Sequence, residues 1–200
     1  MGLKTLFISM SRAPTFEKQK ILLNYKERQH ISKKVLDKEG SIYVDTDSLK
    51  EFHYDPLGPK YVALTDLSYD FAISLYNFDS KQGVVYRFYK NIVENKKTFS
   101  KYLNDFALKN TEARIFGMQN NYFNKQIRNI LFLVFEKNIK FYEIDLFGTE
   151  IRNIALNIET GQTFDILMEN KLYKPGDLAT KITLEEFESK IKINNLTSSN

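Results

Sequence analysis

The sequence contains no cysteine, and its only histidines are His30 and His53. Without cysteine the chain cannot hold a disulfide framework, a thiolate-ligated zinc or iron–sulfur site, or a cysteine nucleophile. Two histidines are too few for a histidine-rich metal site, and their spacing matches no metal-ligand motif. We therefore expect no bound metal and no cofactor.

Glycine is also scarce, with eight residues in a chain of 200. Phosphate-binding loops, dinucleotide fingerprints and nucleophile elbows need glycines at fixed spacing, and none of these motifs occurs. No apolar run approaches the roughly 18 residues of a membrane span. The run Leu6–Met10 is too short for a secretory signal peptide. These absences predict a cytoplasmic protein that does not insert into a membrane.

Positive charge is modest, because the net charge is +4 and is spread along the chain. A nucleic-acid-binding protein usually gathers its basic residues in one patch. The most basic region, Lys18–Lys38, is typical of a solvated helix face. We therefore expect no nucleic-acid partner. The alternative is an unrelated α+β domain whose Lys18–Lys38 region binds an acidic partner or nucleic acid in a salt-sensitive way.

The chain does have enough apolar residues, 42%, to bury the core of one globular domain. Residues 113–166 form its most informative stretch. Within it, apolar side chains of Ile127–Phe135 recur at helical spacing and predict a buried helix. Aromatic and β-branched residues at 114–116, 141–144 and 154–158 predict strands that pack on this helix.

The remaining segments complete an α+β pattern. Further helices are expected at Phe16–Leu36, which Gly40 would end, at Lys97–Lys109, and after a capping box that begins at Thr183. Strands are expected at 42–44, 61–66, 69–77 and 84–89, with a turn at 55–60 and a hairpin joining the last two strands. We predict a layered β-sheet or sandwich core with helices packed on one side.

The same pattern suggests three parts. Residues 1–40 are expected to be an N-terminal extension with an amphipathic helix, and residues 41–168 the compact domain. Residues 169–200 are expected to be a C-terminal appendage with a short helix and a disordered tail. Met10 could serve as the translation start, because the pattern that follows needs nothing before it.

Composition and spacing alone predict no catalytic centre. The neighbouring acids Asp145 and Glu150 are expected to be ordinary solvated surface residues. His53 lies between two aromatic residues, where an imidazole is more often packed and half exposed than catalytic. On this evidence the sequence predicts only a soluble α+β domain.

Five short segments change this interpretation by their shared order. They read LSYDFAISLYN at 67–77, IFGMQN at 115–120, QIRN at 126–129, DLFGTEIR at 145–152 and NIETG at 157–161. In order and spacing they resemble the CheD family of chemoreceptor glutamine deamidases, over roughly residues 41–168. The resemblance implies a CheD-like fold and a role in bacterial chemotaxis. It implies as partners the cytoplasmic helices of a chemoreceptor or another chemotaxis protein.

The family attacks a glutamine carboxamide with a cysteine thiolate that a histidine activates. Carried over by position, the cysteine falls on Asp70, and the histidine falls on Tyr86 when Gly83 is the anchor. The family's hydroxyl residue falls near Leu64 or Thr65. A carboxylate is a poor nucleophile toward an amide, and a tyrosine with an ordinary pKa near 10 cannot replace imidazole at neutral pH. We therefore expect a pseudoenzyme that keeps a binding role.

The resemblance also assigns binding residues. These are Gly117, Asn120, Arg128, Asn129, Gly148 and Arg152. Family glycines are replaced at Ser68, Met118, Phe147 and Ile151, which indicates a rebuilt mouth of the site. An alternative is an amidohydrolase that uses Ser68 or Thr65 as its nucleophile, with His53 approaching in space to activate it.

Overall fold

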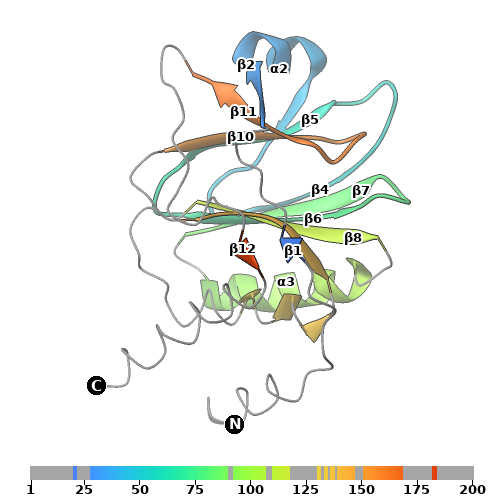
Figure 1. Ribbon diagram of the computed structural model, residues 1–200, viewed down its shortest axis with the longest axis vertical. Helices are drawn as coiled ribbons and strands as arrows, with labels where there is room; N and C mark the ends of the chain where they lie inside the picture. The colour runs from blue at the N-terminus through green and yellow to red at the C-terminus, as the bar shows by residue number, and fades with distance from the viewer. Residues whose placement is uncertain are drawn as a thin grey trace.

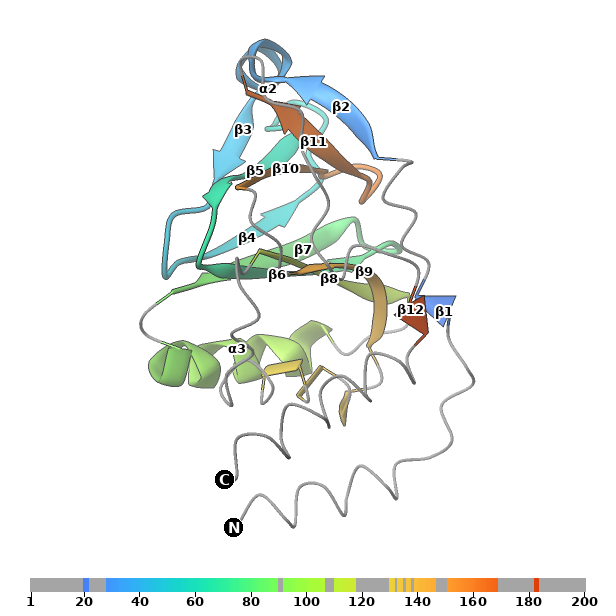
Figure 2. The ribbon, with the colours of Figure 1, turned by 60° about the vertical axis from the view of Figure 1, so that its left-hand side comes forward.

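The computed structural model describes residues 20–21, 28–89, 92–106, 110–117, 130–131, 133–134, 136–137, 139–146, 151–168 and 182–183. In this part of the chain two five-stranded sheets lie face to face, with a helix on each outer side (Figures 1 and 2). The molecule is therefore mixed α+β and mostly strand, which confirms the predicted fold class. No helix in these residues is long and apolar enough to cross a membrane.

The upper sheet of Figure 1 has mixed strand directions. Its order is β2 (Gln29–Ser32), β11 (Thr163–Leu167), β10 (Arg152–Asn157), β5 (Tyr61–Leu67) and β3 (Ser41–Tyr43). The two edge strands, β2 and β3, pair in parallel with their neighbours, whereas the central pairs are antiparallel. Helix α2 (Lys33–Glu39) packs on the outer face through the fully buried Leu36.

The lower sheet forms the middle of the molecule. Its order is β4 (Leu49–His53), β7 (Gln82–Phe88), β6 (Phe71–Asn77), β8 (Thr111–Gly117) and β9 (Lys140–Leu146). The predicted hairpin is confirmed as the antiparallel pair of β6 and β7. Every residue of β6 is buried, because one sheet face meets the upper sheet and the other meets the helical layer.

The layer beneath the lower sheet is apolar. Helix α3 (Ile92–Phe106) buries Phe99, Leu103 and Phe106 there, as its periodicity predicts. Strands β8 and β9 are parallel, so a crossover must join them, and its described residues between 130 and 136 are helical. Ile130, Leu131 and Val134 are fully buried in the same cluster, which confirms the central helix at these positions. Burial of each such side chain contributes about 1.5–3 kcal/mol.

Three expectations about the arrangement of elements are wrong. Residues 20–21 and 29–32 form strands β1 and β2 inside the segment predicted as a helix, because each pairs with a strand from the C-terminal half. The short helix α2 begins only at the N-cap Ser32, and it does end at Gly40, where φ is 81°. A further small sheet joins β1 (Lys20–Ile21) to β12 (Ile182–Thr183).

The other two errors concern packing. Strand β10 packs between the sheets and not on the central helix, since its Ile154 and Leu156 belong to the inter-sheet core. Helices lie on both outer sides of the sandwich and not on one, because α2 covers the upper sheet and α3 the lower. The expectations for Met10, most of residues 16–27, the helix after Thr183 and the C-terminal tail lie outside the described residues.

Candidate functional site

Asp70, the residue that the predicted CheD resemblance aligns with the family's cysteine, is held in a buried ion pair. Its carboxylate contacts Nε of Arg87, and its other oxygen accepts a hydrogen bond of 2.9 Å from the backbone N–H of Ser68. Arg87 also donates to the carbonyl oxygens of Val44, at 3.2 Å, and Asp66, at 3.3 Å. Both carboxylate oxygens of Asp70 therefore accept contacts from the protein. The ion pair of Asp70 and Arg87 links the start of β6 to β7 and β5.

Tyr86, the residue that the predicted resemblance aligns with the family's histidine, lies on the opposite face of the lower sheet. Its ring is buried against Phe88, with ring centroids 4.1 Å apart, and against Phe99 of α3. The next residue, Arg87, points to the other face, where it meets Asp70. Asp70 and Tyr86 therefore cannot act on one substrate atom.

His53 does not approach the predicted nucleophiles. It lies on the edge strand β4 opposite Gln82, at the end of the lower sheet where β6 finishes. Asp70 and Ser68 lie beyond the other end of β6, about 20 Å away at the rise of a strand. Thr65 faces away from the lower sheet on β5, whose inward-facing residues include Leu64. The structure thus gives neither hydroxyl an activating histidine among the described residues.

The two predicted glycines that the structure describes have packing roles. A side chain at Gly83 would meet the ring of Phe52 and the backbone of Leu75. Gly117 has a φ of 106°, and a side chain there would meet the carbonyl oxygen of Asp70. Four further predicted residues lie outside the described part of the chain: Asn120, Arg128, Asn129 and Gly148.

Exposed apolar side chains gather at the strand ends near Asp70. Tyr69 is 63% exposed, Tyr89 43% and Ile151 47%. Tyr69 comes two residues before Phe71, and Tyr89 comes one residue after Phe88, its partner in the β6–β7 ladder, so both lie at the same end of this strand pair. Ile151 directly precedes Arg152, the first residue of β10, which pairs with Leu67, the last residue of β5. Tyr69 follows Leu67 by two residues. Large exposed aromatic residues are typical of protein-binding surfaces.

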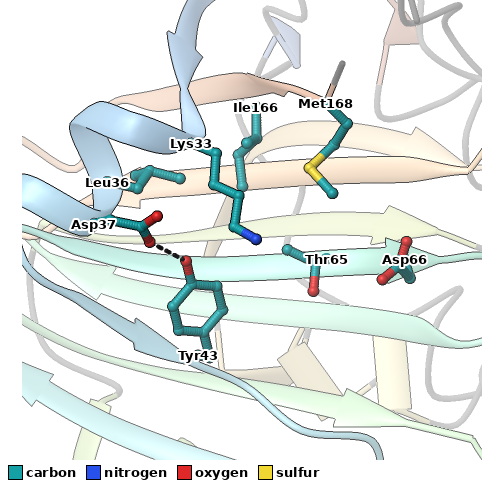
Figure 3. A pocket seen from close by; sticks show the side chains of 8 residues that line it. All are labelled: Lys33, Leu36, Asp37, Tyr43, Thr65, Asp66, Ile166 and Met168. Carbon is teal, nitrogen blue, oxygen red and sulfur yellow. Dashed lines mark hydrogen bonds between the residues drawn. The ribbon is translucent and has the colours of Figure 1, made fainter.

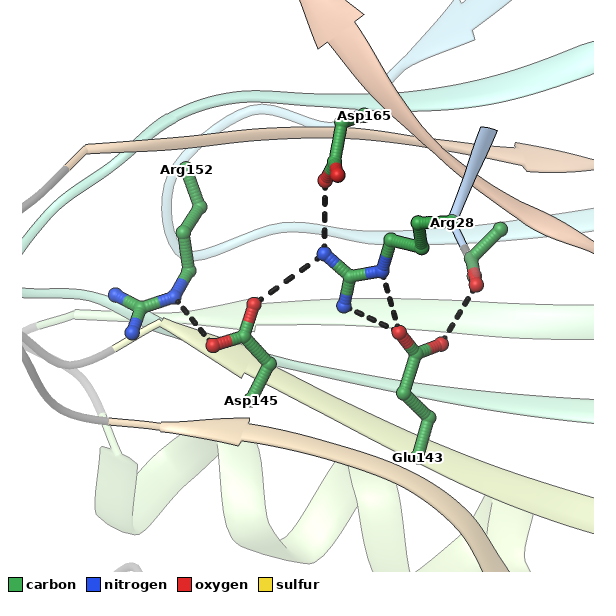
Figure 4. Close-up of polar contacts among 6 residues, drawn as sticks. Arg28, Glu143, Asp145, Arg152 and Asp165 are labelled. Atoms are coloured by element: carbon green, nitrogen blue, oxygen red, sulfur yellow. Dashed lines mark hydrogen bonds and ion pairs between the residues drawn. The ribbon is translucent and has the colours of Figure 1, made fainter. Parts of the chain in front are cut away.

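A buried charged cluster joins the two sheets along one side (Figure 4). Arg28, just before β2, contacts Glu143 and lies 3.3 Å from Asp145, both on β9 of the lower sheet, and 2.8 Å from Asp165 on β11 of the upper sheet. Arg152, the last predicted binding residue, donates from Nε to Asp145 at 3.0 Å. We call these five residues the inter-sheet charge cluster, and each is at most 9% exposed.

The cluster corrects the expectation that Asp145 lies on the solvated surface, since its exposure is zero. Its charge can be buried because two guanidinium groups contact it. Burial lowers the pKa of Arg28, but the carboxylates of Glu143, Asp145 and Asp165 outweigh that effect and raise it. Burial raises the pKa of Asp165, and Arg28 only partly opposes the shift. With its carboxylates occupied by guanidinium donors, this cluster holds the sheets together and offers no general base.

A cavity of about 420 Å³ opens on the outer face of the upper sheet beside α2 (Figure 3). Its polar lining is Lys33, Asp37, Tyr43, Thr65 and Asp66. Its apolar lining is Leu36, Ile166 and Met168. A concave site with an apolar wall and a few convergent polar groups is the usual form of a small-molecule site. Of the sequence-predicted residues that the structure describes, only Thr65 lies here.

Within the described residues no group of three or more acidic or imidazole side chains is placed to hold a metal ion. No known family model matches this sequence. A search of curated proteins also finds no significant relative. The resemblance to the CheD family thus stays a prediction that depends on the order of the five segments.

Proposed function

We propose that this chain is a CheD-like protein of bacterial chemotaxis that acts in the cytoplasm as a binding protein without deamidase chemistry. The observation that carries the proposal is the ion pair of Asp70 with Arg87 at the position of the family's nucleophile. Protein donors engage both oxygens of this buried carboxylate, so the group is held in place. The same position therefore contributes to stability and is not available for covalent catalysis.

The partner proposed is an amphipathic helix of a chemoreceptor or of another chemotaxis protein. Support comes from Tyr69, Tyr89 and Ile151, which are exposed at the strand ends where the family's substrate would approach. Aromatic anchors of this kind carry much of the binding energy in protein interfaces. The apolar face of a helix is a suitable complement to such a surface.

The test is to incubate the full chain with the cytoplasmic fragment of a chemoreceptor, and to follow both retention in a pull-down and the mass of the fragment. We expect retention without the mass increase of amide-to-acid conversion. Tyr69→Ala and Tyr89→Ala should each weaken binding about ten-fold or more, as for an interface hot spot. The matched control is Leu57→Ala, because Leu57 is 96% exposed in a turn beyond the other end of the sheets.

Three outcomes would contradict the proposal. A mass increase that disappears in Asp70→Ala would make the protein an active deamidase with a carboxylate nucleophile. Equal retention of wild type, Tyr69→Ala and Tyr89→Ala would remove the proposed surface. Absence of retention in every case would reject the chemoreceptor as partner.

A further inference from the structure

The cavity beside α2 is lined by a lysine, Lys33, whose charge is not neutralised by the acid on the same helix, Asp37. Lys33 and Asp37 are four residues apart on α2, a spacing at which opposite charges can pair. Asp37 instead accepts a hydrogen bond of 3.2 Å from the hydroxyl of Tyr43 (Figure 3). None of the described residues forms an ion pair or hydrogen bond with the Lys33 ammonium group, which extends over the cavity.

On β5 the cavity is lined by Asp66, which has an unusual backbone conformation. Its φ is 57°, in the left-handed region that a non-glycine residue seldom adopts, and least often within a strand. Two contacts hold it there: Asn153 accepts from its N–H at 2.9 Å, and Arg87 donates to its carbonyl oxygen. The register of β5 and β10 shifts at the same place. Strain that the surroundings hold in place is characteristic of functional positions.

Between Lys33 and Asp66 the cavity is lined by uncharged side chains. The Thr65 hydroxyl group lies beside Asp66 on β5, and Leu36, Ile166 and Met168 provide an apolar wall. A ligand that fills this site needs an anionic group for Lys33, a cationic group for Asp66 and a compact apolar body. An ordinary fatty acid lacks the cation, and a simple amine lacks the anion.

We propose that this cavity binds a free α-amino acid with an apolar side chain. Its carboxylate would pair with Lys33, its ammonium group with Asp66, and its side chain would pack against Ile166 and Met168. Asp37, held by Tyr43, adds negative charge on the side of α2 and disfavours ligands with a net negative charge. This site does not depend on the binding surface at Tyr69 and Tyr89, so each proposal can fail alone.

The experiment is calorimetric titration of the full chain with leucine, methionine and phenylalanine. Two analogues of leucine test its charges: leucinamide lacks the carboxylate, and N-acetylleucine lacks the ammonium group. Because a hydrogen bond to a charged group contributes enough for about a ten-fold change in affinity, we expect each analogue to bind about ten-fold more weakly or worse. Glycine, which has no apolar body, should bind more weakly than leucine.

Two variants assign the charges to residues. Lys33→Gln should weaken leucine binding about ten-fold and remove its advantage over leucinamide. Asp66→Asn should remove the advantage over N-acetylleucine, and asparagine tolerates the left-handed conformation, so the backbone is preserved. The matched control is Lys34→Gln, because Lys34 is the exposed neighbour on the same helix and does not line the cavity.

The proposal is overturned if none of the three amino acids gives saturable binding up to about 10 mM, a range that covers weak small-ligand sites. It is also overturned if leucinamide or N-acetylleucine binds wild type as tightly as leucine does. Unchanged leucine affinity in both Lys33→Gln and Asp66→Asn would likewise reject it.

Discussion

The two buried layers of this molecule are built in opposite ways. Beneath the lower sheet, α3 and the central helix pack against β6, β7, β8 and β9 through apolar side chains, many of them aromatic. Between the two sheets, an apolar centre is flanked by the inter-sheet charge cluster. The first layer depends on non-directional burial, and the second depends in addition on a fixed set of charge partners.

This difference affects how each layer tolerates change. Removing an apolar group leaves a cavity whose cost depends on how far the surroundings can relax. Removing one partner of a buried ion pair leaves the other charge unneutralised in a poorly solvated place. At neutral pH, a substitution in the charge cluster should therefore cost more stability than one in the apolar layer. Only the inter-sheet layer, which contains the cluster, should contribute a stability that changes with pH.

The largest effect is expected for Arg28→Met. This change leaves Glu143 and Asp165 buried without their guanidinium partner, and breaking a buried pair in this way costs about 3–5 kcal/mol. Urea unfolding at pH 7 measures it, with the exposed Lys34→Met as control. The loss should shrink as the pH falls, because protonation removes the unpaired charge. A loss that is the same at pH 5 and pH 7 would show that packing and not charge is responsible.

The apolar layer should give a smaller, pH-independent loss. Leu103 of α3 is 1% exposed in the cluster beneath the lower sheet, and Leu103→Ala should cost about 2–4 kcal/mol. No titratable group is removed, so the difference in unfolding free energy from wild type should be level between pH 5 and pH 8. A slope in that difference would mean that the two layers are coupled through the lower sheet.

These two layers also differ in how far the sequence predicted them. Helix α3, the described part of the central helix and the β6–β7 hairpin follow from local periodicity, which the apolar layer satisfies. The pattern Gln29–Ser32 contains no strand alternation, and it is a strand only because it pairs with β11. Asp145 resembles a surface acid in sequence, since nothing nearby announces that Arg28 will reach it across 117 positions.

The candidate sites show the same limit. The resemblance singled out Asp70 and Tyr86 by order, but faces of a strand alternate, and the structure places the two residues on opposite sides of the sheet. It also singled out Thr65, which does line the cavity. Lys33 and Asp66 belong to no sequence motif, because their roles depend on residues elsewhere in the chain. The Lys33 ammonium group is free because Tyr43 binds Asp37, and the backbone conformation of Asp66 depends on its hydrogen bond with Asn153.

A subtler test of the charge cluster is Asp165→Asn. Burial raises the folded-state pKa of Asp165 above its ordinary value of 3.8. Folding therefore favours the protonated form of Asp165. This preference stabilises the folded state fully below pH 3.8, and the stabilisation is lost as the pH rises through the folded-state pKa. The unfolding free energy of wild type minus that of Asp165→Asn should thus fall as pH rises from 4 to neutrality. Urea unfolding across this range measures it, with Leu103→Ala as the level control. A difference that rises with pH would mean that Arg28 outweighs burial at this carboxylate.

The smallest effect is expected for Arg114→Met, although Arg114 is only 1% exposed in the same inter-sheet layer as Arg28. No described residue hydrogen-bonds to its Nε or Nη1, and its Nη2 lies 3.5 Å from Glu112. Burial lowers its pKa despite the nearby acids, and the guanidinium group lies 4.6 Å from the centre of the Tyr142 ring.

Methionine keeps the contact with Tyr142 and removes two buried donors that have no partner, so the two changes oppose each other. We expect urea unfolding at pH 7 to give a change within about 1 kcal/mol, in either direction. A loss as large as that of Arg28→Met would contradict this view, because a guanidinium with one long carboxylate contact would then be as stabilising as one that contacts three carboxylates. A small stability change for Arg114→Met together with a large loss for Arg28→Met would establish that the stability of the inter-sheet layer depends on its ion pairs and not on the number of its arginines.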